Sequence, residues 1–504
     1  MLNADTAKSL FGLYFFGQPH MPEAEARFDI NEHYNTQELD ELELNSLDNE
    51  DRPKNILYHL NCDWDSFQGS LRNSSTGIFD AFFSSIGSIA TQNLDFKSKL
   101  GITASTFLGA FAAGKFKIPF ISDKISLFHY AGRLARSPLH LFDSAFSAIG
   151  ESWSESSIAN IATLGLGALG IRNSYKNPKD FQENSELDYQ TISGTLARSS
   201  LHHLQSLISS FGQTIFAKAP ILGTLATVVI TALNSKVPQS IKEHHISWKS
   251  LNGLLGQNLF HFTDSLYSGL GSLVSKEILK SKALSLLTLP ALVATSFLPD
   301  LEKKMSEKLI FTKLGAKATR SMMHGLDTIV FNLGTQFAKT KLALPFLGAY
   351  GLLSYSSSLN KDLALAKIPE FKIPLNEIGS LLHRLPFDFV ESVISESSNK
   401  LSKKIPAPLL VLFGPALSFQ LGKAFKDAKT PFNSSTGLVL KHLLHFWDNL
   451  LTSAGYQTGK SVLKLFGLSA KQNNSGSILS DGRWLSDEGR IISKMALGKQ
   501  LAQN

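Results

Sequence analysis

Two kinds of apolar segment alternate along the chain between residues 67 and 468. In the first kind, apolar residues recur every three or four positions, as in Leu134, Leu141, Ala145 and Ile149. This spacing predicts an amphipathic helix, which we call helix A. The second kind carries no charged residue and predicts a second helix, helix B, in six windows: 100–114, 156–171, 219–235, 283–299, 342–360 and 405–422. Since no strand-like alternation competes, the pattern predicts an all-α chain of helical hairpins.

A polar signature recurs in the A segments and sets their period. The segment that runs from Gly132 to Asp143 reappears from Gly194 to Gln205, and again from Gly253 to Asp264. We call the last residue of each copy its anchor, and seven anchors can be assigned: Asp80, Asp143, Gln205, Asp264, Asp327, Glu391 and Asp448. Their intervals are 63, 62, 59, 63, 64 and 57 residues. Such even spacing indicates an internal duplication with a period of about sixty residues.

The period predicts the domain organisation. Residues 1–66 form an acidic, partly disordered N-terminal region, and residues 469–504 form a polar C-terminal tail. Between them lie seven helical-hairpin repeats at approximately 67–129, 130–191, 192–250, 251–313, 314–377, 378–434 and 435–468. Because each unit needs only its neighbours, the array is expected to be a solenoid, a toroid or a membrane-associated helical array. The seventh unit lacks helix B, as a terminal unit is expected to differ from the others.

Helix A also carries a stripe of polar residues at fixed distances from the anchor. A basic residue precedes the anchor by seven positions and a histidine precedes it by three, while Ser or Thr follows by four and Gly by seven, with exceptions in single units. On a helix these offsets lie within about 80° of one another. The candidate ligand-binding residues on this stripe are Arg136, His140, Asp143, Arg198, His202, His261, Asp264, Arg320, His324, Asp327, Lys441, His445 and Asp448.

The stripe has two interpretations. The favoured one is a register device, in which His and Asp pair within a helix and Arg and Asp pair between neighbouring A helices. The alternative is a polar groove that binds an anionic ligand through Arg and His. We assign no catalytic residue, because seven near-equivalent active centres in one chain would be unusual. If the protein were an enzyme, His140 with Asp143 or His261 with Asp264 would be the acid–base pair.

Charge is divided unevenly along the chain. The net charge is +7, but residues 1–66 hold fourteen acidic and four basic residues, which leaves +17 for the remainder. The acidic stretch 35–54 is too polar to order itself alone, and it is a candidate docking segment for a protein partner. The positive charge consists of lysines spread over the helix ends, without a dense basic run. This pattern favours anionic membrane lipid over nucleic acid, and we expect no nucleic-acid partner.

Cysteine content and short motifs exclude several classes of site. The single cysteine, Cys62, excludes an internal disulfide and a zinc site built from cysteines. We expect no metal and no cofactor. The relaxed phosphate-loop match from Ala454 to Ser461 falls within a predicted helix A, where a phosphate loop has no place. The N-terminus lacks a basic region before its apolar patch, so we expect no secretory signal peptide and a cytoplasmic or cytoplasmic-membrane location.

The B windows suggest the function. They are 15 to 19 residues long, slightly below the roughly 20 that span a bilayer, and lysines flank most of them. We therefore expect a non-enzymatic, membrane-associated helical-repeat protein with a structural or interaction role. The alternative is a soluble scaffold or toroid, with the B helices as its inner layer, that binds a protein or an apolar ligand. An enzyme within a helical toroid is the least favoured hypothesis.

Overall fold

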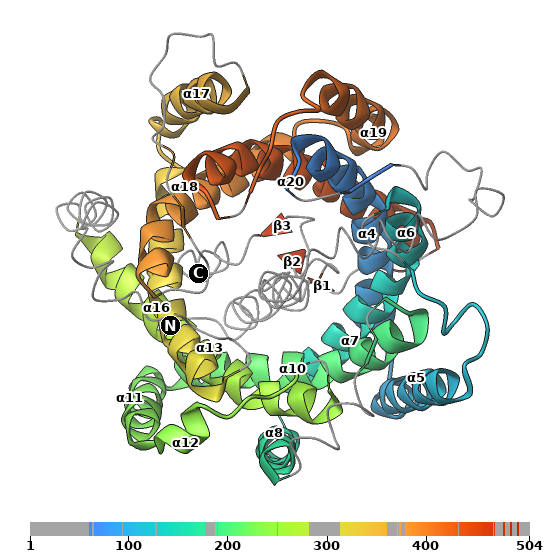
Figure 1. Cartoon of the computed structure of the whole chain (residues 1–504), viewed down its shortest axis with the longest axis vertical. Coiled ribbons are helices and arrows are strands. Elements are labelled where there is room, and N and C mark those ends of the chain that lie inside the picture. Colours follow the sequence, from blue (N-terminus) through green and yellow to red (C-terminus); the bar gives the residue numbers. More distant parts are fainter. Residues whose placement is uncertain are drawn as a thin grey trace.

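The computed structural model in Figure 1 shows an all-helical architecture, apart from three very short strands near the C-terminus. The residues it describes are 60–62, 65–92, 94–125, 129–154, 156–176, 187–188, 190–248, 250–281, 313–359, 370, 372–373, 378–431, 433–466, 468, 477–478, 484–485 and 491–492. The all-α prediction is confirmed for this part of the chain. The acidic region up to residue 59 and the B window 283–299 lie outside the described residues.

The A segments form the long helices. They are α4 (Phe67–Gln92), α6 (Tyr130–Arg136) continued by the 3₁₀ turn η2 (Ser137–Leu139) and α7 (His140–Trp153), α10 (Ile192–Lys218), α13 (Leu251–Lys280), α16 (Leu314–Phe337), α18 (Ile378–Ser402) and α20 (Ser435–Leu465). Each begins thirteen residues before its anchor, at the first residue of a predicted unit. The single interruption, η2, contains Pro138, whose missing N–H and fixed φ disfavour a helix interior.

Short polar residues fix where these helices start. The hydroxyl of Ser66 accepts the N–H of Gly69 at 3.0 Å, and Ser250 accepts that of Gly253 at 3.0 Å. Thr191 and Ser434 cap α10 and α20 in the same way, again on a glycine three residues later. Each cap satisfies one of the N–H groups that a helix start leaves without a partner, which typically contributes about 1 kcal/mol.

The long helices follow one another around a ring, as Figure 1 shows. Each packs against the next, and α20 packs against α4, so that the last long helix meets the first. Backbone bonds support this seam: the N–H of Phe67 donates to the carbonyl of Ala428 at 2.9 Å, and that of Thr430 to Asp65 at 2.7 Å. Similar bonds join the starts of neighbouring long helices elsewhere, as from Tyr130 to Leu60 at 2.9 Å. The connection at the seam therefore resembles those inside the chain.

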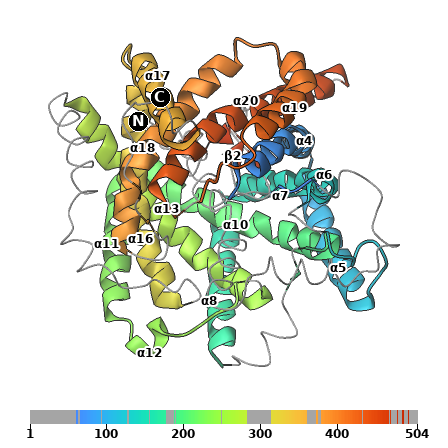
Figure 2. The same cartoon turned by 45° about the horizontal axis from the view of Figure 1, so that its top comes forward.

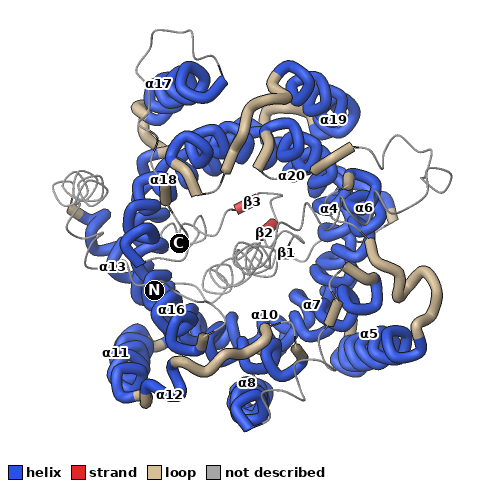
Figure 3. Tube along the Cα trace, viewed as in Figure 1, coloured by secondary structure: helices blue, strands red, loops and turns tan. Residues whose placement is uncertain are grey.

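The B windows form shorter helices on the outside of this ring. They are α5 (Phe96–Phe116), α8 (Ser157–Lys176), α11 (Pro220–Lys236) followed by α12 (Gln239–Lys242), α17 (Ala343–Ser354) followed by the π-helical turn η3 (Tyr355–Leu359), and α19 (Ala407–Ala424). Figure 3 shows them outside the long helices all around the circumference. The placement of the B helices as an inner layer, expected for a soluble toroid, is therefore wrong. Helices α8 and α11 are nearly end-on in Figure 1 and lengthwise in Figure 2, so they run roughly along the ring axis.

Outer helices reach past the neighbouring unit. Helix α5 packs against α10, α8 against α13, α17 against α20 and α19 against α4, which in each case is the long helix two units further around the ring. Helix α11 departs from this rule and packs against α10 and α13. Apolar clusters form where the layers meet: Val330, Leu333 and Phe389 of the long helices contact Phe346 of α17. The apolar core is therefore a layer between the ring and its outer helices.

Small residues let neighbouring long helices approach closely. The glycine seven positions after the anchor lies against the backbone of the next long helix, two positions before that helix's own anchor. A Cβ atom on it would lie 2.0–2.6 Å from a carbonyl oxygen; the pairs are Gly87–Leu141, Gly150–His203, Gly271–Gly325, Gly334–Phe389 and Gly455–Ile78. No side chain fits there without a backbone shift. The last pair belongs to the seam, which is packed like the internal contacts.

Strands in the C-terminal tail were not expected from the sequence. Two-residue strands β1 (Ser477–Ile478), β2 (Trp484–Leu485) and β3 (Ile491–Ile492) pair antiparallel in the order β1-β2-β3. They lie inside the ring in Figure 1, with β1 against α4 and α7 and β3 against α18 and α20. The sequence between β1 and β2 contains Asp481-Gly482, a dipeptide typical of hairpin turns, which should have predicted this pairing. The rest of the predicted tail lies outside the described residues.

Candidate functional site: a buried histidine–carboxylate ladder

The polar stripe lies at the contacts between neighbouring long helices. Ten of its candidate residues are buried, each with no more than 9% of its surface exposed: Arg136, His140, Asp143, His202, His261, Asp264, His324, Asp327, Lys441 and Asp448. The other three, Arg198, Arg320 and His445, are partly buried. The stripe is thus covered by protein along most of its length. The hypothesis of an anion-binding groove stays a prediction.

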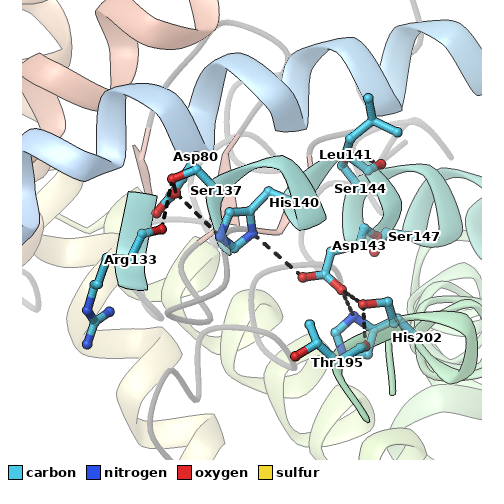
Figure 4. Close-up of polar contacts among 11 residues, drawn as sticks. Asp80, Arg133, Ser137, His140, Leu141, Asp143, Ser144, Ser147, Thr195 and His202 are labelled. Carbon is cyan, nitrogen blue, oxygen red and sulfur yellow. Dashed lines mark hydrogen bonds and ion pairs between the residues drawn. The ribbon is translucent and has the colours of Figure 1, made fainter. Parts of the chain in front are cut away.

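We call the row of buried histidines and carboxylates along these contacts the ladder. Figure 4 shows the part of it between α4, α7 and α10. His140 lies between two carboxylates, with Nε2 3.5 Å from Asp80 on the preceding helix and Nδ1 3.6 Å from Asp143 on its own helix. The hydroxyl of Ser137 also donates to Asp80, at 2.5 Å. His202 repeats the arrangement one helix on, at 3.5 Å from Asp143. Asp143 therefore contacts groups from two helices, α7 and α10.

The same contacts recur further around the ring. His324 lies 3.5 Å from Asp264 and 3.6 Å from Asp327, and Arg320 adds a 3.5 Å ion pair with Asp327. His445 lies 3.0 Å from Glu391 of the preceding helix. In the third unit the anchor is an amide, and Gln205 donates to Gln257 of the next helix at 3.4 Å. A polar residue three or seven positions before one anchor thus meets the anchor of the preceding helix.

Burial and pairing set the ionisation of these groups. Burial raises the pKa of Asp143, but hydrogen bonds from His140 and Ser199 and the charges of His202 and His140 outweigh it, so this pKa lies well below its usual range. Glu391 has its pKa lowered to about 2, because the neighbouring histidines and Arg384 outweigh burial. Burial lowers the pKa of His202 to about 4 in spite of Asp143. At neutral pH Asp143 and Glu391 are therefore ionised, while His202 is neutral.

The sixth unit has Asp388 where five other units have histidine. Burial first, and then the negative charge of Asp327, raise the pKa of Asp388 well above its usual value. A neutral carboxyl has one O–H donor, as a neutral imidazole has one N–H. We therefore expect the neutral carboxyl group of Asp388 to donate a hydrogen bond where five other units have a histidine N–H.

We predict that Asp388→Asn stabilises the protein at pH 7 and above. The raised pKa means that the folded state disfavours the ionised form, so stability from this group is present at low pH and is lost as pH rises above the unfolded value. An amide keeps a donor and cannot ionise. Thermal unfolding of both proteins at pH 5, 7 and 9 would measure the effect, and a gain in Tm that grows with pH is expected. A variant less stable than the wild type at pH 9 would contradict it.

Sequence reasoning missed one position of the ladder. The hydroxyl of Ser199, six residues before its anchor, donates to Asp143, as Ser137 does to Asp80. Ser or Asn occupies this offset in five units, so a scan of one further offset would have found it. At the same offset in the seventh unit, His442 shares a 2.6 Å hydrogen bond with the hydroxyl of Tyr350 in α17. Tyr350 belongs to an outer helix, so no fixed offset from an anchor in the sequence predicts this contact.

The ladder residues lie against one another across the contacts between the long helices. Among the described residues, no three His, Cys, Asp or Glu side chains are placed to hold a metal ion. The match from Ala454 to Ser461 is helical throughout as part of α20, and Gly459 within it packs against Ser85. Hydrogen bonds that alternate between neighbouring helices fix how those helices slide against each other.

The outer surface is the second candidate site. Large apolar side chains are exposed on every described outer helix, including Ile158 of α8 at 83%, Ile221 of α11 at 84%, Leu344 of α17 at 79% and Leu412 of α19 at 70%. Within the described ranges, α19 is the one continuous helix long and apolar enough to cross a membrane, and α10 with α11 passes the same test only as a pair bent by 118°. Exposed apolar side chains in this number make the outer helices a candidate surface for binding lipid, protein or an apolar ligand.

Comparisons with known proteins add no relative. No family model matches this chain, and neither a curated protein nor a solved structure is significantly similar to it.

Proposed function

We propose that this protein is a non-enzymatic toroid of seven duplicated helical hairpins that associates with a membrane through its outer helices. The observation that carries the proposal is the exposed apolar surface on α5, α8, α11, α17 and α19. In this proposal the long helices form a rigid frame, and the outer helices enter the apolar layer of the bilayer. The role of the protein is then structural, or that of an interaction platform at a membrane.

The distribution of this surface favours lipid over a protein partner. The exposed apolar side chains belong to helices that lie at the top, at the bottom and on the lower flanks of the ring in Figure 1. A single protein partner would have to encircle the ring to cover them, whereas lipid surrounds an inserted protein on all sides. Exposed apolar surface of this extent in water would also favour aggregation.

Lysines at the ends of the outer helices support the same proposal. Helix α11 lies between Lys218 and Lys236, and α19 between Lys404 and Lys423. A lysine at the end of an apolar helix can extend its ammonium group to the lipid headgroups while its methylene chain stays in the apolar layer. Helices of 17 and 18 residues are about 26 Å long at 1.5 Å per residue, close to the roughly 30 Å of the hydrocarbon layer.

The ladder supports the framework role. The long helices contact each other through small residues, buried hydroxyls and paired charges, and the apolar layer lies between them and the outer helices. Close helix contacts through Gly and Ser are common in membrane proteins, where apolar burial does not drive helix association. Such contacts would stay intact when lipid replaces water on the outside.

The proposal is tested by lysine substitutions on an outer helix. In Ile221→Lys/Leu225→Lys, two exposed side chains one turn apart on α11 become charged, so the folded protein loses no packing. A lysine at the centre of an inserted helix costs about 2.5–3.5 kcal/mol, and less near its end. We expect the double variant to bind neutral phosphatidylcholine vesicles at least about tenfold more weakly in a flotation assay.

The matched control is Ser235→Lys/Ser240→Lys, which adds the same charge at exposed positions beside Lys236 and Lys242. It should float with vesicles as the wild type does. Circular dichroism and Tm should be the same for all three proteins. A wild-type protein that stays monodisperse without detergent and never floats would favour the alternative, a soluble scaffold.

A further inference from the structure

One part of the rim carries an unusual concentration of positive charge. The turn from α16 to α17 contains Lys339 and Lys341, and the end of α18 with the following turn contains Lys400, Lys403 and Lys404. All five side chains are exposed. The equivalent turn before α11 has one lysine, Lys218.

The fold brings these two turns together. The ammonium group of Lys400 donates to the carbonyl of Ala338 at 2.9 Å, which ties the end of α18 to the turn that follows α16. Glu396 is the acid beside them, with its carboxylate 3.9 Å from Lys400. Partial burial, and then the charge of Lys400 against the attraction of Glu396, lower the pKa of Lys339. Lys339, Lys400 and Glu396 are thus close enough to affect one another's charge, and Lys341, Lys403 and Lys404 lie in the same two turns.

Exposed apolar side chains border this lysine patch. Leu342 is 66% exposed and Leu344 79% exposed at the start of α17, and Leu401 is 38% exposed between the lysines of the α18 end. Positive charge directly beside apolar surface matches an amphiphile with an anionic head and an acyl chain. A soluble anion would use only the first of these features.

We propose that the patch formed by Lys339, Lys341, Lys400, Lys403 and Lys404 is a binding site for the headgroup of an anionic phospholipid, with the acyl chains along α17 and α19. This inference rests on the proposed membrane association and adds a lipid class and a location to it. The phosphate accepts hydrogen bonds from the ammonium groups and relieves their mutual repulsion. The site gives the ring one preferred contact with charged lipid.

The test compares two double variants with equal changes in charge. Lys403→Glu/Lys404→Glu alters the patch, and Lys97→Glu/Lys99→Glu alters the first turn of α5. Flotation is measured with phosphatidylcholine vesicles and with vesicles that also contain phosphatidylglycerol. Each lysine near an anionic surface strengthens binding about fivefold. We expect the patch variant to lose at least about tenfold more of its preference for anionic vesicles than the other variant does.

The outcomes separate the two proposals. Equal losses in both variants, or a wild type that binds neutral and anionic vesicles equally, would overturn the site and leave the membrane association standing. No binding to any vesicle would overturn the membrane association itself. A titration with inorganic phosphate alone provides the remaining comparison. In one outcome, the wild type binds millimolar phosphate, the patch variant does not, and the wild type binds neutral and anionic vesicles equally. This outcome would assign the patch to a soluble anion and overturn the lipid proposal.

Discussion

Gly455→Val is expected to destabilise the protein by more than about 3 kcal/mol and to open the ring at its seam. A Cβ atom at this position would lie 2.1 Å from the carbonyl oxygen of Ile78 and 2.8 Å from its carbon. Both are backbone atoms, so α4 and α20 must move apart. Denaturant unfolding would measure the loss in stability, and hydrogen exchange of the α4 and α20 amides would locate it.

Two control variants sharpen this result. Gly101 of α5 has nothing within 4 Å of an added Cβ, so Gly101→Ala should stabilise its helix by about 0.5–1 kcal/mol. Gly150→Val makes the equivalent change at an internal contact, where the Cβ would lie 2.1 Å from the carbonyl oxygen of His203. If Gly455→Val is harmless while Gly150→Val is severe, α20 and α4 are not in contact in solution, and the closed ring is wrong.

Asp143→Ala is expected to cost about 3–5 kcal/mol. The carboxylate is 5% exposed and contacts His140, His202 and the hydroxyl of Ser199, so its removal takes a charged partner away from three buried polar groups. Asp143→Asn keeps one acceptor oxygen and should lose less. Urea unfolding at pH 7 measures both variants.

The control is Glu277→Ala, which removes an exposed carboxylate paired with Lys280. Exposed pairs contribute about 0–1 kcal/mol, so its effect should be small. A cost for Asp143→Ala no greater than that of Glu277→Ala would show that the ladder does not hold α7 against α10.

The ladder also predicts loss of stability in mild acid. His202 has a folded pKa of about 4 against an ordinary value of 6.5, so the unfolded chain binds a proton between these pH values and the folded chain does not. Stability therefore falls as pH drops from 6.5 to 4, by up to about 3 kcal/mol for this group. The lowered pKa of Asp143 acts in the same direction at still lower pH. His202→Gln should flatten the upper part of this curve.

The fold was largely accessible from the sequence because it depends on short-range patterns. Three-to-four spacing around Leu141 and Ile149 is enough to predict α7, and a serine or threonine before a glycine marks where α10 or α13 begins. Whether the B helices lie inside or outside the ring of long helices could not be predicted from the sequence. A helix without charged residues has the same composition whether protein or lipid surrounds it, so exposed Ile158 and Ile221 look like core residues in the sequence.

The candidate site was accessible only in part. Fixed offsets from the anchor placed His140 and Asp143 on one helix face, and the structure brings both to the neighbouring helices. No offset could predict that α17 would supply Tyr350 to His442, because the two residues lie 92 positions apart in the chain. The lysine patch has the same origin, since it depends on a contact between Lys400 and a turn sixty-two residues earlier.

The reach of the outer helices has a consequence for how the chain acquires its structure. Helix α5 ends at residue 116, but its partner α10 starts at residue 192, and α19 finds its partner α4 more than three hundred residues back. During synthesis, α5, α8 and α17 therefore wait for later chain before the long helix two units further on is made. Contacts so distant in sequence slow folding and leave apolar helices exposed meanwhile. Early capture of these helices by a bilayer or a chaperone would shield them until the last unit arrives.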